Sequence, residues 1–292
     1  MKELVVISGK GGTGKTSITA CFASMARNMV LCDADVDAAD LHLLMAPEIL
    51  SRHDFQGGGQ AIIQRDKCTE CGLCRDLCRY DAVREDFTID EINCEGCGVC
   101  VDFCPEHAID FPPKTCGEYY ISNTRFGPMV HARLGIAEEN SGKLVTLIRG
   151  EAKEIAEKEK LDLIITDGPP GVGCPVIASI GGADLLLIVT EPTLSGLHDM
   201  ERVVQLADHF NVPCMVCINK HDINSENTRL IEQFAEKKNI SVLGKIPFDS
   251  VFIKSMVQGK NIIEYNGNSE AGKVIKAIWD KLMPSLIVTN EK

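Results

Sequence analysis

Residues 9–16 read Gly-Lys-Gly-Gly-Thr-Gly-Lys-Thr, which matches the phosphate-binding pattern G-x-x-x-x-G-K-[ST]. A short apolar run at 4–8 comes before it, and a helical pattern begins at Lys15. Glycines let the backbone curl so that successive N–H groups point at phosphate oxygens, and the N-terminus of the following helix adds its dipole. The pattern therefore predicts a nucleotide site at Gly9, Lys10, Gly11, Gly12, Thr13, Gly14, Lys15, Thr16 and Ser17.

The residue types around this loop also predict a magnesium site beside the phosphates of the bound nucleotide. Lys15 should reach the β- and γ-phosphates, and the hydroxyl of Thr16 should lie on Mg²⁺. Asp167 follows a second apolar run and opens the segment Asp-Gly-Pro-Pro-Gly. This segment resembles the Walker B and second-switch segment of P-loop ATPases. The resemblance implies that the Asp167 carboxylate holds the same Mg²⁺ and that the glycines beside it let the segment respond to the γ-phosphate.

The cysteines form two runs with identical spacing, C-x₂-C-x₂-C-x₃-C, separated by a constant offset of 26 positions. This spacing resembles that of bacterial two-cluster ferredoxins, in which the fourth cysteine of each run ligates the other cluster. The resemblance implies two [4Fe–4S] clusters. One would be held by Cys68, Cys71, Cys74 and Cys104, and the other by Cys94, Cys97, Cys100 and Cys78.

Zinc is the alternative, because paired C-x₂-C units also form zinc sites. Zinc sites usually have a longer spacer between the two pairs, so four cysteines within eleven residues, twice over, favour iron–sulfur. One position departs from the ferredoxin pattern. Arg79 follows the first run where Pro105 follows the second, so we expect the neighbouring cluster to be more solvated or shifted in potential.

The second lysine of the loop, Lys10, gives the chain a wider resemblance to the deviant-Walker ATPases. These are the MinD, ParA and Mrp proteins and the nitrogenase iron protein. The resemblance implies that Lys10 reaches the nucleotide of a partner subunit, in an ATP-sandwich dimer of the chain with itself or with a paralogue. Asp35 matches the carboxylate that activates water in this family, and Asp33 matches the acidic residue that precedes it. Asp37 and Asp40 are alternative candidates for the water-activating role. The catalytic residues implied are Lys10, Lys15 and Asp35.

The same resemblance places the base-binding positions late in the chain. Asn219, Pro247 and Asp249 occupy the family's adenine-binding positions, and an Asn amide can pair with both a donor and an acceptor on adenine. The segment Asn-Lys-His-Asp at 219–222 also resembles the guanine motif N-K-x-D. ATP/ADP is the expected nucleotide, because the resembled family prefers ATP.

Two further cysteines have an open role. Cys174 lies seven residues after Asp167, and the nitrogenase iron protein has a cluster-ligating cysteine at the matching position. Cys116 could supply a second ligand to such a cluster at the dimer interface. The alternative is that both are structural or merely reactive thiols.

The elements that must position these residues alternate between strand and helix at both ends of the chain. Apolar runs at 4–8, 30–32, 161–166, 185–190 and 214–219 are typical of strands covered on both faces. The pattern predicts an α/β fold, a doubly wound and mainly parallel P-loop NTPase sheet. The cysteine-rich segment interrupts it and is expected to be a small α+β ferredoxin-like insert. The predicted domains are 1–59 and 114–292 for the ATPase and 60–113 for the insert, with Gly57–Gly59 as a flexible entry and Pro112-Pro113 as the exit.

Composition restricts the classes of partner. The 292-residue chain has a net charge of −12, which disfavours a broad nucleic-acid surface. No run of about 18 apolar residues occurs, so membrane association is not expected. The N-terminal apolar run is too short for a signal peptide, so we expect a cytoplasmic protein. Fourteen cysteines in a reducing compartment favour metal or redox chemistry over disulfides.

Three functions agree with these features. The first is an ATPase whose nucleotide-driven dimer switching supports electron delivery to, or metallocofactor or Fe–S maturation of, a redox or metallocofactor partner protein. The second is an Mrp-type iron–sulfur cluster carrier, and the third a MinD/ParA-like positioning ATPase with redox-sensing clusters. The completely ligated ferredoxin-like runs favour the first, and the acidic balance disfavours DNA partitioning.

Overall fold

The structure is a computed structural model that describes residues 1–135 and 141–286. Its contacts divide the chain into two units. Unit 1 comprises residues 1–52, 119–132 and 141 onward, and unit 2 comprises 53–118 with the described residues 133–135. The strands β3 (Glu48–Gly59) and β6 (Pro113–Thr124) contribute residues to both units. The domain boundaries at 59/60 and 113/114 stay predictions.

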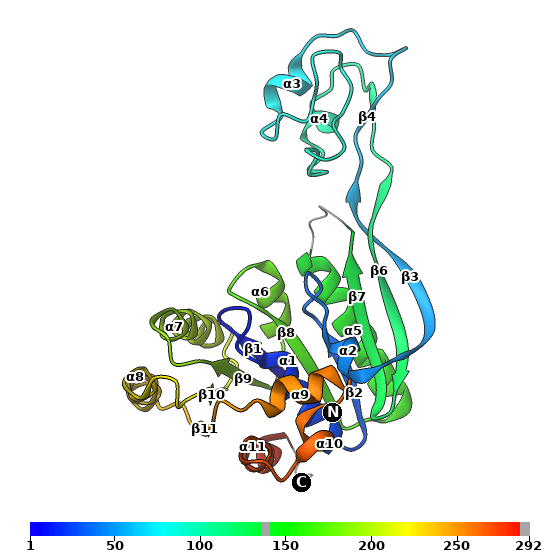
Figure 1. Ribbon diagram of the computed structural model, residues 1–292. Coiled ribbons are helices and arrows are strands. Elements are labelled where there is room, and N and C mark those ends of the chain that lie inside the picture. Colours follow the sequence, from blue (N-terminus) through cyan, green and yellow to red (C-terminus); the bar gives the residue numbers. More distant parts are fainter. Residues whose placement is uncertain (136–140, 287–292) are drawn as a thin grey trace, which may run out of the picture. The chain divides into compact units, whose positions relative to one another are not determined.

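Unit 1 is built on a nine-stranded sheet of order β11-β10-β9-β1-β8-β2-β7-β6-β3 (Figure 1). Strand β1 pairs in parallel with β8 and β9, β2 with β7 and β8, and β10 with β9 and β11. The predicted mainly parallel P-loop fold is therefore confirmed for these strands. The remaining bounds are β1 (Lys2–Ser8), β2 (Met29–Asp33), β7 (Gly127–Leu134), β8 (Leu163–Pro170), β9 (Leu185–Thr190), β10 (Cys214–Asn219) and β11 (Val242–Ile246).

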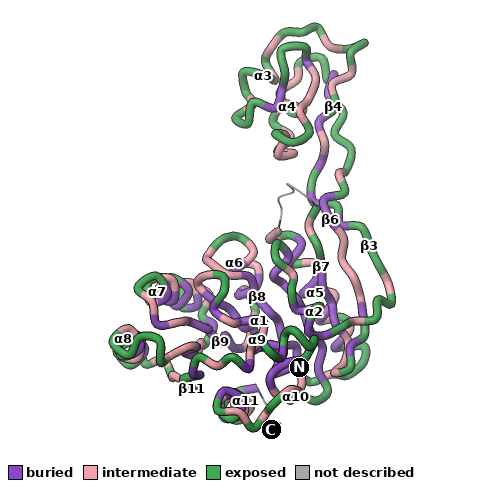
Figure 2. Tube along the Cα trace, in the orientation of Figure 1, coloured by how far each residue is buried: buried purple, intermediate pink, exposed green. Residues whose placement is uncertain are grey.

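Helices cover both faces of this sheet, because successive side chains of a strand point to opposite faces. In β1, Leu4 and Val6 join one buried cluster, and Val5 and Ile7 join the other. Figure 2 shows the neighbouring strands β8 and β9 coloured as buried. The first cluster is completed by α1 (Lys15–Met25), α2 (Leu41–Met45), α9 (Val251–Val257), α10 (Ile262–Asn266) and α11 (Glu270–Leu286). The second is completed by α6 (Cys174–Ile180), α7 (Leu194–His209) and α8 (Ser225–Lys237). Helix α5 (Ser141–Glu159) contacts β2, β8 and α6.

Unit 2 contains two short antiparallel strands, β4 (Ile62–Ile63) and β5 (Ile109–Asp110), and two short helices, α3 (Leu73–Leu77) and α4 (Val99–Asp102). Each helix follows a glycine with positive φ, Gly72 at 84° and Gly98 at 76°. These two positions differ by the 26-residue offset of the cysteine runs, so the repeat in the sequence is also a repeat in the backbone. Glycine is suited to this turn because a side chain at positive φ is strained.

The segment at Gly57–Gly59 differs from the flexible entry that the sequence suggests, because these glycines lie in strand β3. Their role in unit 2 is close packing. A Cβ on Gly59 would lie 2.5 Å from the ring of Phe111, and one on Gly57 would lie 3.2 Å from the sulfur of Cys116. Pro113 likewise begins strand β6.

Within the described residues, no helix combines the length and apolar character needed to cross a membrane.

Candidate functional site

The chemistry-bearing residues of unit 1 gather where parallel strands end, at the carboxyl edge of the sheet (Figure 1). The loop at 9–16 follows β1, and Asp33 ends β2. In the strand register, Asp167 of β8 is paired with Asp33 on one side and with Val6 of β1 on the other. This is the edge at which open parallel sheets bind ligands.

Lys15 and four oxygen-bearing side chains form a compact cluster. The Nζ of Lys15 lies 3.0 Å from Asp167 Oδ1 and 3.3 Å from Asp35 Oδ2. Thr16 Oγ1 donates to Asp167 Oδ2 at 2.7 Å, and Thr19 Oγ1 donates to Asp167 Oδ1 at 2.9 Å. The structure thus brings together the lysine, hydroxyl and carboxylates that the sequence assigns to phosphate, Mg²⁺ and water. Hydroxyl and carboxylate oxygens are ligands that Mg²⁺ accepts.

Burial and like charge perturb this cluster. Burial and the nearby carboxylate of Asp167 raise the pKa of Asp33 well above its ordinary value, against the opposing effect of Lys15. Burial also raises the pKa of Asp35, again opposed by Lys15. For Lys15, burial lowers the pKa, but Asp167, Asp35 and Asp33 outweigh it, so the pKa is raised. Three carboxylates around one ammonium leave excess negative charge, and a bound cation would relieve it.

Asp33 also fixes the loop that follows it. Its two carboxylate oxygens accept from the backbone N–H groups of Asp35 and Leu41, each at 3.3 Å. The segment from Asp35 to the start of α2 is therefore tied back to the end of β2.

The phosphate loop is braced from the end of β10. Gly14 has φ 89°, and a Cβ there would lie 2.4 Å from Asn219 Nδ2, so the position requires glycine. Asn219 Nδ2 donates to the carbonyl of Thr13 at 2.8 Å, and its Oδ1 accepts from the N–H of Lys220 at 3.0 Å. The amide expected to read adenine is thus engaged with the loop, and its contact with a base stays a prediction.

Thr13 carries a second sign of a ligand. Its Oγ1 is the buried side-chain oxygen that lacks a hydrogen-bond partner within residues 1–135 and 141–286. Leaving a buried hydroxyl unpaired costs about 1–3 kcal/mol. A phosphate oxygen in the loop would supply the acceptor that this hydroxyl lacks, so the loop fits the nucleotide that its pattern predicts.

Glu191, which the sequence interpretation missed, lies directly after β9 and contacts two lysines. Its Oε1 forms an ion pair with Lys10, and its Oε2 lies 3.1 Å from the Nζ of Lys220. Lys220 Nζ also donates to the carbonyl of Gly12 at 3.1 Å. Burial raises the pKa of Glu191, but hydrogen bonds from Lys10 and Lys220 outweigh it and the pKa is lowered. An acidic residue at the end of a buried strand was the available signal, since Asp33 and Asp167 were recognised by the same feature.

The remaining base-binding candidates lie in the segment after β11. Asp249 Oδ1 accepts from the N–H of Val251 at 2.9 Å, at the start of α9. Asp222, the last residue of the guanine-like motif, accepts from the N–H of Phe248 at 2.7 Å. This bond joins the motif to the segment that contains Pro247. Base recognition by Pro247 and Asp249 stays a prediction.

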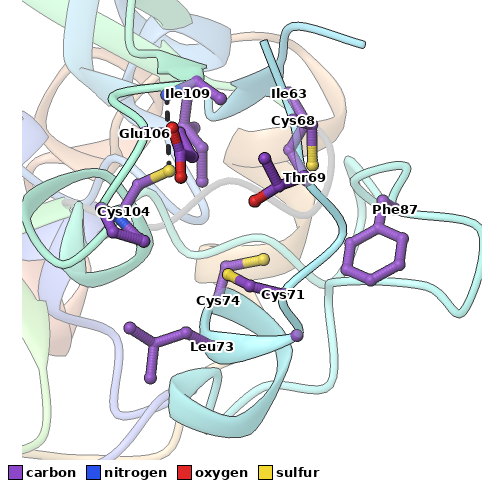
Figure 3. Close-up of a pocket in the computed structure, with 13 residues that line it drawn as sticks. Ile63, Cys68, Thr69, Cys71, Leu73, Cys74, Phe87, Cys104, Glu106 and Ile109 are labelled. Carbon is purple, nitrogen blue, oxygen red and sulfur yellow. Dashed lines mark hydrogen bonds between the residues drawn. The ribbon is translucent and has the colours of Figure 1, made fainter.

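The cysteines of unit 2 surround two cavities, and the partition matches the two expected ligand sets. The first cavity has about 340 Å³ of space and is lined by Cys68, Cys71, Cys74 and Cys104 (Figure 3). The second has about 400 Å³ and is lined by Cys78, Cys94, Cys97 and Cys100. Each cavity therefore takes three cysteines from one run and the fourth from the other, as in the crossed ligation of two-cluster ferredoxins.

The geometry of these thiols bears on the choice of metal. Among the described residues, no three His, Cys, Asp or Glu side chains converge closely enough to hold a single metal ion. A [4Fe–4S] cluster makes a different demand, because each cysteine binds a different iron and the thiols must surround a space. Backbone N–H groups of Glu70 and Ala108 already donate to the sulfurs of Cys68 and Cys104, at 3.4 and 3.3 Å. Two clusters in these cavities stay a prediction.

The two speculative cysteines lie in different units. Cys116 is buried in β6 within unit 2, and its sulfur lies 3.5 Å from the carbonyl of Lys114. Cys174 is exposed at the first residue of α6 in unit 1. A shared metal role for this pair stays a prediction.

The comparisons with known proteins concern the whole chain. Residues 4–262 match the family model described as the CobQ/CobB/MinD/ParA nucleotide binding domain. An uncharacterized protein of Methanocaldococcus jannaschii, MJ0578, is 34% identical over 289 residues, 96% of each chain. The septum site-determining protein MinD of Bacillus subtilis is 23% identical over 89% of this chain and 81% of its own.

Two further matches are limited, one in coverage and the other in sequence identity. An iron–sulfur cluster carrier protein of Pyrococcus abyssi is 32% identical, over 43% of this chain and 46% of its own. Among solved structures, MinD from Pyrococcus horikoshii, complexed with Mg-ADP, has a TM-score of 0.60 at 17% identity and covers 96% of this chain and 95% of its own, which shows the shared fold. The chain belongs to the CobQ/CobB/MinD/ParA nucleotide-binding domain family.

Proposed function

We propose that the chain is an ATP-hydrolysing switch whose unit 2 holds two [4Fe–4S] clusters. In this proposal, nucleotide-driven dimerisation controls electron delivery to a partner protein, or maturation of its metallocofactor. The observation that carries the proposal is the sorting of eight cysteines around two cavities in the crossed pattern of two-cluster ferredoxins.

The nucleotide half of the proposal uses residues that already meet in unit 1. The backbone of the loop and Lys15 would bind the phosphates, and the unpaired hydroxyl of Thr13 would donate to one of them. Thr16 and Asp167, which share a hydrogen bond of 2.7 Å, would hold Mg²⁺. Asp35 would orient the attacking water and accept its proton, because its carboxylate lies beside Lys15. Its raised pKa brings it closer to the range of a base working near neutrality.

The cluster half uses unit 2. One cluster would be held by Cys68, Cys71, Cys74 and Cys104. The other would be held by Cys78, Cys94, Cys97 and Cys100. When bound, such clusters supply one-electron transfer at potentials set by their hydrogen bonds and solvation. The chain's contribution is to present thiols around preformed cavities and to donate N–H groups to sulfur, as Ala82 does to Cys78 at 3.4 Å.

A short stretch of chain connects the nucleotide site of unit 1 to unit 2. The loop that carries Asp35 leads directly into α2, and α2 leads into β3, which enters unit 2. A change in the loop at 33–41 would therefore act on the chain segment that leads to the clusters. This continuity supports coupling of nucleotide state to the clusters.

The test is an anaerobic EPR-monitored redox titration with and without a non-hydrolysable MgATP analogue. The proposal expects about eight iron atoms per chain, a [4Fe–4S] signal and a midpoint potential that moves when the analogue binds. Reconstituted protein without an iron–sulfur signal would overturn the cluster half. If the clusters are present but their potentials do not change, the proposed coupling between nucleotide and clusters is wrong.

Single serine variants test the ligand sets. Cys104→Ser and Cys78→Ser should each reduce the iron content by about half, because each cysteine serves one of two [4Fe–4S] clusters. Cys104→Ser and Cys68→Ser should alter the same EPR signal, because the two cysteines would bind the same cluster although they belong to different runs. Cys214→Ser, at the start of β10 in unit 1, is the matched control and should keep the full iron content.

A second candidate function is iron–sulfur cluster carriage, favoured by the partial similarity to the Pyrococcus abyssi protein. A carrier should pass a cluster to an apo-ferredoxin acceptor faster than free iron and sulfide assemble one. Retention of both clusters in the presence of the acceptor would exclude this role and leave electron delivery.

A further inference from the structure

Lys10 is fully engaged within its own chain. A lysine ammonium has three N–H donors. Lys10 Nζ forms an ion pair with Glu191, lies 3.3 Å from Thr193 Oγ1 and lies 3.4 Å from Ser195 Oγ. Three oxygens therefore match its three donors, two from the turn after β9 (Glu191 and Thr193) and one from the first turn of α7 (Ser195). Any phosphate that is to bind Lys10 must take over at least one of these contacts.

Glu191 is the charged member of this set, and it contacts a second lysine as well as Lys10. One of its oxygens faces Lys10 of the phosphate loop, and the other faces Lys220, which follows β10. The side chain of Glu191 is only 15% exposed, so water screens these contacts weakly. Lys220 stays bound to the loop through the carbonyl of Gly12. Lys220 therefore keeps Glu191 beside the loop even when Lys10 departs.

The turn that carries Glu191 is itself rigid. Thr193 is the N-cap of α7, and its Oγ1 accepts from the N–H of Gly196 at 2.9 Å. Thr190 Oγ1 donates to the carbonyl of Gly196 at 3.0 Å. Glu191 thus lies in a hydrogen-bonded turn, so we expect Lys10 to be the partner that moves when the pair breaks.

We propose that Glu191 is a positioning residue that competes with nucleotide phosphate for Lys10. A carboxylate and a phosphate are both anionic acceptors, so they exclude each other at one ammonium. Glu191 sets a threshold for recruiting Lys10, and nucleotide binding includes the cost of breaking the Lys10–Glu191 pair. The proposal rests on the nucleotide half of the proposed function.

The experiment is a double-mutant cycle on the affinity for a fluorescent ATP analogue, measured on the full chain. Glu191→Gln removes the competing charge and keeps the side-chain shape. We expect it to tighten binding by about two- to fivefold, the range for a partly exposed ion pair. In the Lys10→Ala background, the same substitution should have no such effect, because the mobile partner is missing. Glu191→Asp should behave more like the wild type than Glu191→Gln does, since it keeps the charge.

Glu201→Gln, in the body of α7, is the matched control and should leave affinity unchanged. An equal effect of Glu191→Gln in both backgrounds would overturn the proposal, and so would weaker binding in Glu191→Gln protein with an intact fold. Wild-type protein that binds no ATP analogue would overturn the proposed function instead.

Discussion

At the scale of single residues, the nucleotide site consists of a small group of charged side chains that are buried together. Lys15 balances Asp35 and Asp167, and its aliphatic stem is almost fully enclosed. These residues were predictable because each follows a recognisable apolar run. The contacts of Lys10 with Glu191, Thr193 and Ser195 were not predictable, since they join positions more than 180 residues apart that no local pattern connects.

The first prediction concerns Lys10 itself. If Lys10 reaches the nucleotide of a second subunit, Lys10→Ala should abolish ATP-dependent dimerisation and leave the iron content intact. Sedimentation of the protein with a non-hydrolysable analogue would measure this. Lys273→Ala, on the exposed side of α11, is the control with an equal loss of charge. A variant that still dimerises with ATP would contradict the sandwich arrangement.

The second prediction concerns His131, a buried residue of β7. Its Nε2 lies 2.9 Å from Ser122 Oγ, and its ring stacks between those of Tyr120 and His42. Burial and His42 lower its pKa to about 4. The unfolded chain, with a pKa near 6.5, binds the proton more readily, so stability is full above about pH 6.5 and declines as the pH falls toward 4.

Between pH 7 and pH 5 this decline should reach up to about 2 kcal/mol. Urea unfolding, followed by the fluorescence of the single tryptophan, Trp279, would measure it. His131→Gln should show a smaller pH dependence, whereas His209→Gln, at an exposed helix end, should behave like the wild type. An unchanged slope in His131→Gln would refute this assignment.

At the scale of elements, periodic apolar patterns were informative and polar strands were not. The apolar runs at 185–190 and 214–219 coincide with β9 and β10, because central parallel strands are buried on both faces. The strands β3, β6 and β7 were not predicted. Segment 48–59, for example, mixes charged residues with three glycines, and its strand conformation comes from pairing with distant segments.

A buried ion pair and the hydrogen bonds around it join four elements, α5, β1, α6 and β8. Arg149 of α5 donates to both carboxylate oxygens of Glu3 in β1, at 2.8 and 2.6 Å. It also donates to the carbonyls of Ala178 and Gly181 at the end of α6. Thr166 of β8 donates to Glu3 as well, at 2.9 Å. The helix that begins at Cys174 is therefore fixed to the central strand at its C-terminal end.

Arg149→Met should destabilise the protein by about 3–5 kcal/mol, because it leaves a buried carboxylate without its partner. Adding Glu3→Gln should recover much of that loss, since an amide can still accept from Thr166 without carrying a charge. Chemical denaturation of the two variants would measure both values. A double variant no more stable than Arg149→Met alone would show that the cost lies in lost packing instead.

At the scale of the whole molecule, the two units were recognisable from composition, because cysteine is concentrated between residues 68 and 104 in unit 2. The strand conformation of the segment that leads into the cysteine-rich part was not recognisable from the sequence. A triple glycine and a double proline suggest loops, whereas long-range pairing places the three glycines in β3 and makes Pro113 the first residue of β6.

The last prediction removes most of unit 2. Replacing residues 53–118 by a short Gly-Ser linker should leave a folded, iron-free protein that still binds ATP, because both cut points lie in β3 and β6, which are neighbours in the sheet. Circular dichroism and nucleotide titration would measure this. An unfolded product would mean that unit 1 depends on unit 2 for stability.

That neighbouring pair of strands has an evolutionary consequence. A segment that leaves a sheet on one strand and returns on the next can be gained or lost in a single genetic event without changing the order of the other strands. The cysteine-rich part can therefore have been acquired as a cassette by an ancestral ATPase that already had its catalytic edge. Natural variants of this chain that lack the cassette would then keep the residues of the phosphate loop and lose all eight cavity-lining cysteines together.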